Sequence, residues 1–371
     1  MRLADLETPR LVLDAERMEA NVARLKSHLA SLGVRLRPHV KTCKSIEVAR
    51  ALVDSPAGPI TVSTLKEAEQ FLEHGVTDIL YAVGIAPGKL DHVMALRARG
   101  ADLAVVVDSV EAAQAVAAKG AGIPALIEID CDGHRAGVKP GHPVLLDIAK
   151  ALAKGARPAG VMTHAGDSYN CRTTQAIADM AEQERGAVVK SAAVLRSGGF
   201  ACPVVSVGST PTATFARSLE GVTEVRAGVF VFHDLVMAGL GVCRVEDVAL
   251  SVLCTVIGHQ REKGWIITDG GWMATSRDRG TARQAVDQGY GLVCDEEGRA
   301  LGDLVVTDAN QEHGIVARRD GQPFDVAQYP VGTRLRILPN HACATAAQHD
   351  AYHVVRGGTE VLARWPRFGG W

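Results

Sequence analysis

The sequence has no long apolar run and no marked excess of charge. No run of eighteen apolar residues occurs, so no segment is predicted to span a bilayer. The net charge of −2 and the isoelectric point near 6.7 give no reason to expect binding to nucleic acid or to a membrane. The first residues, Met1 to Glu7, lack the apolar region of a secretory signal. We therefore expect a cytoplasmic protein with neither a nucleic-acid nor a membrane partner.

Two common cysteine and glycine motifs are also missing. The eight cysteines are scattered and none forms a CxxC pair, which indicates neither a disulfide framework nor a structural zinc site. Most of them are expected to be small buried hydrophobic residues. No GxGxxG motif follows the first strand-like run, and this absence argues against a dinucleotide-binding domain.

Strand-like runs alternate with helix-like runs through the first two thirds of the chain. Eight apolar runs occur, at residues 34–40, 59–64, 78–83, 103–107, 125–129, 159–163, 203–207 and 223–232. Eight strands with intervening helices is the count of a (β/α)8 barrel. An open doubly wound sheet is the alternative. We favour the barrel because the dinucleotide motif is absent.

The pattern changes after about residue 240. Short strand-like runs follow, separated by Gly, Asp and Pro turns, at residues 248–257, 264–268, 291–294, 314–318 and 333–338. We predict an α/β protein with a barrel at residues 15–240 and an antiparallel β domain formed by residues 1–14 and 241–371. The early strand-like run at 8–14 is expected to join the β domain, because it precedes the first helix of the barrel.

Lys41 stands at the end of the first barrel strand, within RPHVKT (37–42). The carboxyl ends of parallel strands form the edge where ligands bind. A partly desolvated lysine there can lose its proton and form a Schiff base with a carbonyl substrate or with pyridoxal phosphate. On position alone, a solvated lysine at a loop mouth is the alternative. The strand ends also carry the polar residues His39, Tyr81, His164, Tyr169 and Arg226, which favours a catalytic site at this end of the barrel.

The segment GSTPT (208–212), which follows the seventh strand, is a candidate phosphate site. Its small residues let backbone N–H groups approach an anion, and its hydroxyl groups add donors. Barrels often hold phosphate at this position together with the loop after strand eight, where Gly228 lies. A plain Ser/Pro turn is the alternative.

His341 and Cys343, within PNHAC (339–343), are candidate metal ligands. If this segment is extended, side chains two residues apart point the same way, so an imidazole and a thiolate can share one metal ion. Two protein ligands leave positions open for water or a substrate oxygen, as in a catalytic site. A buried histidine beside a buried cysteine is the alternative.

Five motifs together resemble the fold-type III pyridoxal phosphate enzymes that act on D-3-hydroxy amino acids. They are RPHVKT (37–42), HAG (164–166), GSTPT (208–212), EVRAG (224–228) and PNHAC (339–343). This family includes D-serine dehydratase, D-threonine aldolase and D-threo-3-hydroxyaspartate dehydratase, and the sequence resembles the last of these most. The resemblance runs from about Thr8 to the end of the sequence.

The resemblance implies an alanine-racemase-like barrel, a homodimer, bound pyridoxal 5′-phosphate and a divalent metal ion (zinc, magnesium or manganese). It implies that Lys41 holds the cofactor covalently, that Tyr169 lies near the pyridine nitrogen, and that His341 and Cys343 hold the metal. Further cofactor-binding candidates are His39, His164, Gly208, Ser209, Thr210, Arg226 and Gly228.

One position separates members of the family. The metal pair reads His-x-Asp in the aldolases and His-x-Cys in the dehydratases, and Cys343 places this sequence with the dehydratases. The implied activity is that of a lyase converting D-threo-3-hydroxyaspartate to oxaloacetate and ammonia. The alternatives are a D-threonine aldolase giving glycine and an aldehyde, a D-serine dehydratase giving pyruvate and ammonia, and a non-catalytic pyridoxal phosphate carrier. The carriers lack a second β domain and a metal pair.

Two residues are candidates for contact with the substrate itself. Arg277 lies in a charged segment, and its guanidinium can bind a second substrate carboxylate through two N–H groups. A solvated charged loop is the alternative for this segment. Tyr81, at the end of the third strand-like run, is the other candidate.

Overall fold

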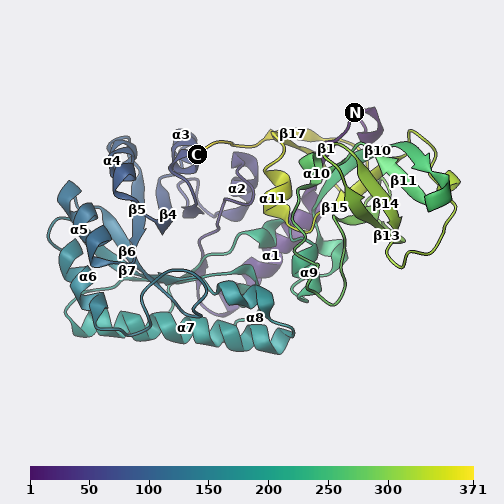
Figure 1. Cartoon of the computed structure of the whole chain (residues 1–371). Coiled ribbons are helices and arrows are strands. Elements are labelled where there is room, and N and C mark those ends of the chain that lie inside the picture. Colours follow the sequence, from purple (N-terminus) through teal and green to yellow (C-terminus); the bar gives the residue numbers. More distant parts are fainter. The chain divides into compact units, whose positions relative to one another are not determined.

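The computed structural model describes all 371 residues and divides into two compact units. The barrel unit comprises residues 24–228 and 368–371, and the β unit comprises residues 1–23 and 229–367. The barrel unit contains a parallel sheet and the β unit an antiparallel one, as the labelled strands of Figure 1 show. None of the helices combines the length and the apolar character that a transmembrane segment needs.

Eight parallel strands form the sheet of the barrel unit, in the order β2-β9-β8-β7-β6-β5-β4-β3. Their bounds are β2 Arg35–Leu36, β3 Ile60–Val62, β4 Asp78–Gly84, β5 Asp102–Val107, β6 Pro124–Ile129, β7 Arg157–Thr163, β8 Val204–Val207 and β9 Glu224–Val225. A parallel bridge between His39 and Thr61 joins the chain beyond β2 to β3, so the two ends of the sheet meet. The predicted (β/α)8 barrel is confirmed.

Helices alternate with these strands. They are α1 Ala15–Ser31, α2 Ile46–Leu52, α3 Leu65–Glu73, α4 Leu90–Ala98, α5 Val110–Lys119, α6 Val144–Leu152, α7 Thr174–Ser197 and α8 Thr210–Phe215. Several begin where a hydroxyl accepts a backbone N–H of the first turn, as Thr64, Ser109 and Thr173 do for α3, α5 and α7. The long α7 runs along the barrel unit in Figure 1.

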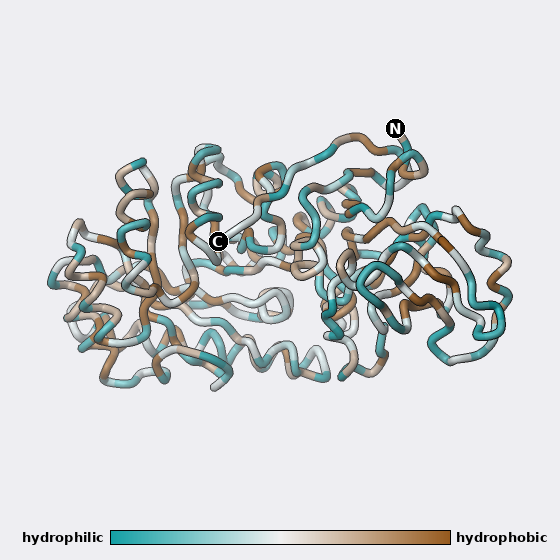
Figure 2. The backbone as a smooth tube through the Cα atoms, turned by 45° about the horizontal axis from the view of Figure 1, so that its top comes forward, coloured by the Kyte–Doolittle hydropathy of each residue, from teal (hydrophilic) through white to brown (hydrophobic).

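An apolar cluster lies on one face of the parallel sheet. Its buried side chains are drawn from four neighbouring strands and consist of Leu80, Val106, Leu126, Ala159 and Met162. Successive side chains of a strand point to opposite faces, so the residues between these face the helices. Hydrophobic and hydrophilic segments alternate along the chain in Figure 2, as this layering requires. Buried polar groups also occur within the sheet: the carboxylate of Glu224 in β9 accepts from the Ser206 hydroxyl at 3.0 Å and from the Arg37 guanidinium at 2.9 Å.

Six strands of the β unit form a closed antiparallel ring. They are β10 Leu250–Gln260, β11 Trp265–Thr268, β12 Leu292–Cys294, β13 Ala300–Ala309, β14 Gly314–Arg318 and β15 Arg334–Leu338. The ring closes because β10 pairs with both β11 and β15. The sheet continues from β10 through β1 (Arg10–Asp14) and β16 (Ala351–Val355) to β17 (Ala363–Pro366). The expectation that the early strand joins the β domain is confirmed.

Two predicted strands are much shorter than expected, and the run at 34–40 keeps its strand only at Arg35–Leu36. The run at 223–232 keeps its strand only at Glu224–Val225, and Val229–Val231 forms a 3-10 turn. The chain leaves the sheet at Gly228, which packs against the carbonyl of His39. Apolar composition alone cannot locate such an exit, because the turn residues are also buried.

Candidate active site and metal pair

Lys41 lies in a tight turn beyond the first barrel strand, two residues after the bridge that His39 makes to Thr61. The Lys44 N–H donates to the Val40 carbonyl at 2.8 Å and closes the turn. Val40 and Thr42, on either side of Lys41, are fully buried, whereas Lys41 is exposed. The backbone that carries the lysine is therefore fixed while its amine stays accessible.

Two imidazoles of the barrel unit are held neutral. Burial, and then the positive charges of Lys41 and Arg226, lower the pKa of His39 well below its usual value. Burial lowers the pKa of His164 to about 4, although the Gly208 carbonyl acts in the opposite direction. His164 Nδ1 donates to that carbonyl at 2.6 Å, so Nε2 is left as an acceptor.

We expect the cofactor-free protein to lose stability as the pH falls from 6.5 to about 4, in part through His164. In this range the unfolded chain holds a proton on His164 that the folded protein does not, so stability rises with pH. The shift corresponds to roughly 3 kcal/mol. Denaturant unfolding at a series of pH values measures it. His164→Gln should flatten the dependence and the exposed His134→Gln should not; an unchanged slope in H164Q would contradict the assignment.

Arg226 is buried and has polar partners on two sides. Its guanidinium donates to the Ser206 hydroxyl at 2.7 Å and to the Thr163 carbonyl. Burial lowers the pKa of Arg226, and the carboxylates of Glu224 and Glu184 act against that effect. The strand ends of β7, β8 and β9 are thus joined by one buried cation.

The loop after β8 brings hydroxyl groups together. Ser209 Oγ accepts from the Thr212 N–H at 3.2 Å and begins α8, and it lies 3.0 Å from Ser168 Oγ. A Cβ at position 208 would lie 1.8 Å from the Arg226 carbonyl oxygen, so only glycine fits there. At Gly228 the corresponding distance to the His39 carbonyl oxygen is 2.8 Å. At both glycines the backbones of two segments therefore lie too close together to leave room for a side chain.

Glu184, which stands in none of the five motifs, organises that loop. Its carboxylate accepts from the backbone N–H groups of Ala165 and Gly208, both at 3.0 Å, and from the Thr212 hydroxyl at 2.7 Å. Burial raises its pKa, and the three hydrogen bonds act against that effect. An acidic residue on the buried face of α7, between Ala181 and Ala187, was the available signal.

The other predicted site residues of the barrel unit, Thr210, Tyr169 and Tyr81, lie in three different environments. Thr210 is buried next to Ser209, and Tyr169 lies in the 3-10 turn Gly166–Asn170 with 37% of its surface exposed. Tyr81 is buried, and alternation along β4 points it to the face opposite that of Leu80. There its hydroxyl accepts from Lys89 at 3.1 Å.

His341 and Cys343 follow β15 in the β unit. The segment is extended only as far as His341, which is the N-cap of α11 (Ala342–Ala346), and Cys343 lies in the first turn of that helix. Alanine is the strongest helix former, and the buried carboxylate of Asp234 accepts the Ala342 N–H at 3.0 Å. The imidazole and the thiol nevertheless make a side-chain hydrogen bond.

Asp278 holds the imidazole of His341 from behind. Its Oδ2 lies 2.7 Å from His341 Nδ1, and this contact lowers the pKa of Asp278. Burial lowers the pKa of His341, but Asp278 and Cys343 outweigh it and raise that pKa to about 11. No group of three or more His, Cys, Asp or Glu side chains is arranged to hold a metal ion.

Arg277, the predicted substrate contact next to Asp278, is exposed, with its guanidinium 5.1 Å from the centre of the Trp272 ring.

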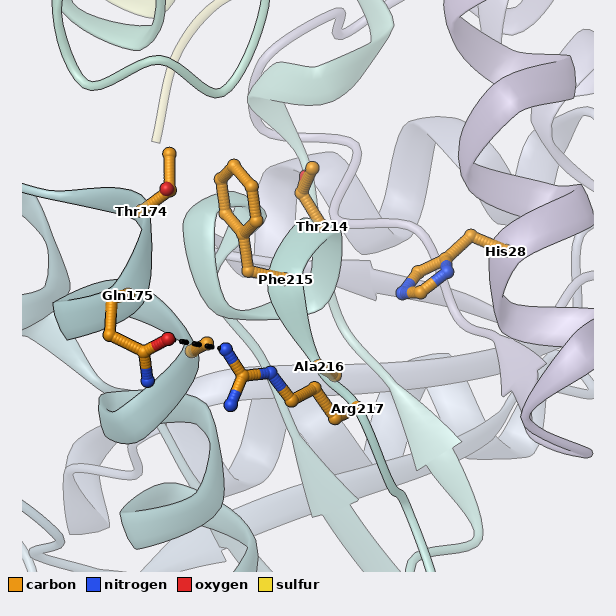
Figure 3. A pocket seen from close by; sticks show the side chains of 8 residues that line it. His28, Thr174, Gln175, Thr214, Phe215, Ala216 and Arg217 are labelled. Carbon is orange, nitrogen blue, oxygen red and sulfur yellow. Dashed lines mark hydrogen bonds between the residues drawn. The ribbon is translucent and has the colours of Figure 1, made fainter.

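A cavity of about 320 Å³ lies elsewhere in the barrel unit, between α1, α7 and the end of α8 (Figure 3). Arg217 crosses it and donates to the Gln175 side-chain oxygen at 2.6 Å. None of the predicted site residues lines this cavity.

Comparison with known proteins places the chain in a family. The family model described as the alanine racemase N-terminal domain matches residues 13–235, and the putative serine dehydratase domain matches residues 249–355. The chain is 57% identical to D-threo-3-hydroxyaspartate dehydratase of Delftia sp. (strain HT23), over 100% of this chain and 99% of that protein. It is 31% identical to a D-threonine aldolase of Arthrobacter sp., over 98% and 94% of the two chains.

Solved structures agree with this placement. The Delftia dehydratase superposes with a TM-score of 0.96 at 56% identity over 100% of both chains. D-threonine aldolase from Filomicrobium marinum superposes with a TM-score of 0.82 at 27% identity, over 99% and 96% of the two chains. The chain therefore belongs to the fold-type III pyridoxal phosphate enzymes of the D-serine dehydratase and D-threonine aldolase family.

Proposed function

We propose that the protein is a pyridoxal phosphate- and metal-dependent lyase that converts D-threo-3-hydroxyaspartate to oxaloacetate and ammonia. The observation that carries this proposal is the 57% identity, over the whole chain, to an enzyme named for that reaction. Cys343, in place of the aldolases' carboxylate, supports elimination over cleavage of the carbon chain.

The barrel residues fit the cofactor. Lys41 presents an accessible amine, the Ser209 and Thr210 hydroxyls with the backbone at Gly208 and Gly228 suit a phosphate, and His39 Nδ1 is buried without a hydrogen-bond partner. Bound pyridoxal phosphate would supply an electron sink for the charge that develops at the substrate Cα. Tyr169, His164 and Arg226 complete the proposed cofactor site.

Lys41 is assigned two roles. It holds the cofactor covalently and, when free, takes the proton from the substrate Cα as a general base. His39 is a weak base beside Lys41, because burial and the positive charges of Lys41 and Arg226 lower its pKa. The hydroxyl group leaves with a proton as water, and hydrolysis of the resulting imine gives the 2-oxo acid and ammonia.

His341 and Cys343 fit a divalent metal through one nitrogen and one sulfur donor, a set that favours zinc over magnesium or manganese. Two ligands leave positions for water and for the 3-hydroxyl of the substrate. The metal would act as a Lewis acid toward that leaving group. A thiolate ligand is less suited than a carboxylate to accept the hydroxyl proton, which carbon–carbon cleavage must remove. The pair therefore supports dehydration.

Asp278→Asn is expected to weaken metal binding by about 10–100-fold. The carboxylate orients His341 through the 2.7 Å hydrogen bond and makes the imidazole a better ligand. Competition with a chromogenic chelator measures the affinity directly. The exposed Asp308→Asn removes the same charge from the same unit and should bind metal normally. Equal metal affinities for the two variants would show that Asp278 does not support metal binding by His341.

The reaction is tested by product analysis on a panel of substrates. We expect ammonia and oxaloacetate from D-threo-3-hydroxyaspartate, in preference to pyruvate from D-serine and products from D-threonine. Arg277 is proposed to bind the second carboxylate, so Arg277→Ala should raise KM for the dicarboxylate and not for D-serine. Glycine with an aldehyde and no ammonia would establish the aldolase alternative. Equal activity on L-isomers would contradict the stereochemical assignment.

The proposal includes a homodimer in the cytoplasm, as the family resemblance implies. Each protomer has a mass of 39.2 kDa, so sedimentation of the holoenzyme at twice that mass is the expected result. A monomeric mass in the active enzyme would contradict it.

A further inference from the structure

The last four residues, Phe368–Trp371, belong to the barrel unit, whereas the residues before them belong to the β unit. The Phe368 N–H donates to the Lys44 carbonyl at 2.5 Å. The Phe368 ring packs edge-on against Phe71 of α3, with 5.0 Å between ring centres, and lies 5.7 Å from the His74 ring. Trp371 is 97% exposed. Phe368 is therefore the anchored residue of this segment.

Lys44 is the residue that ends the turn carrying Lys41. Its φ of +42° lies in the left-handed region, which a non-glycine residue keeps only when its surroundings hold it there. Three polar contacts do so. The Lys44 N–H is bound to the Val40 carbonyl, its Nζ lies 3.2 Å from a Glu67 carboxylate oxygen, and its carbonyl accepts from Phe368.

We propose that Phe368 is a positioning residue for Lys41: it fixes the Lys44 end of the turn, and through the turn it fixes the position of the Lys41 amine. The inference rests on the proposed function of Lys41. Without Phe368 the Lys44 carbonyl loses its donor and α3 loses an aromatic contact, so the turn relaxes. Displacement of a reacting group by about 1 Å can cost roughly a hundredfold in rate.

The test compares four holoenzymes: deletion of residues 368–371, Phe368→Ala, Phe368→Tyr and Trp371→Ala. The deletion is expected to lower kcat per bound cofactor about tenfold, with a much smaller change in KM, and to shift the pH dependence of the visible absorption of the lysine-bound cofactor. Phe368→Ala should show a smaller effect of the same kind, because it keeps the N–H. Phe368→Tyr should restore normal values. Trp371→Ala should change them far less than the deletion does, because the contact between its exposed ring and Lys44 Nζ, at 6.0 Å, is weak.

Borohydride reduction and peptide mapping of the unaltered enzyme come first. An adduct on another lysine would overturn the proposed function itself. With the adduct on Lys41, a deletion protein that keeps its kcat per bound cofactor and its pH profile would overturn the role of Phe368 alone. A purely structural role would lower cofactor content and melting temperature and leave both of those readouts unchanged.

Discussion

Lys41→Ala is expected to lower turnover by at least about a thousandfold, because the substitution removes both the covalent attachment of the cofactor and the base for the α-proton. The turn that holds Lys41 is closed by backbone hydrogen bonds between Val40 and Lys44, so the substitution should leave the fold intact. Circular dichroism and thermal melting check the fold. Turnover with D-threo-3-hydroxyaspartate and reduction with borohydride check the function.

The matched control is Lys139→Ala, which removes an exposed lysine from the same unit and should retain full activity. In the unaltered protein the reduced adduct should map to the peptide that contains Lys41. An adduct on Lys44 or Lys66 would show that the strand-end assignment is wrong.

His341→Ala and Cys343→Ala are each expected to lower activity by at least about a hundredfold, more than the loss of an outer-shell partner would cost. Each removes one of the two donor atoms, and the remaining ligand cannot hold the metal alone. Metal analysis should show an empty site. Cofactor absorption should persist, since Lys41 and the phosphate residues belong to the barrel unit rather than the β unit.

Chelation of the unaltered enzyme should reproduce the effect of these substitutions, and added divalent cations should reverse it only in the unaltered protein. Cys243→Ala, which changes a partly exposed cysteine of the same unit, is the control and should keep its metal. Full activity of H341A after exhaustive dialysis against chelator would exclude the metal from the reaction. A solved structure of a cysteine-to-alanine variant of D-threo-3-hydroxyaspartate dehydratase, 55% identical to this chain, is described as metal-free.

Local sequence patterns were sufficient to predict the barrel. Buried parallel strands are continuous apolar runs, and such runs mark β4, β5, β6 and β7 clearly. The strand β13 was missed because its outer half carries polar residues such as Asp303 and Asp308, which hide the apolar core of Leu304 to Val306. Patterns of this mixed kind resemble loops until pairing partners are known.

The site could be predicted only where one short motif carries it. Lys41, Ser209, His341 and Cys343 each stand in such a motif. Asp278 is 63 residues from its partner His341, and that contact depends on tertiary folding rather than on spacing. The helix that begins after His341 could not be predicted for a similar reason, because its N-terminus is completed by the distant carboxylate of Asp234.

The closed ring of the β unit has a consequence for self-association. A strand with two neighbours offers no free backbone groups to another molecule, so in this sheet only β17 has an open edge. That strand is four residues long and contains Arg364 and Pro366. Charged side chains and proline, which lacks an N–H, keep an exposed edge strand from pairing with a strand of another molecule. This edge therefore offers little to sheet-to-sheet aggregation, and the protection resides in two side chains to which no catalytic role is assigned.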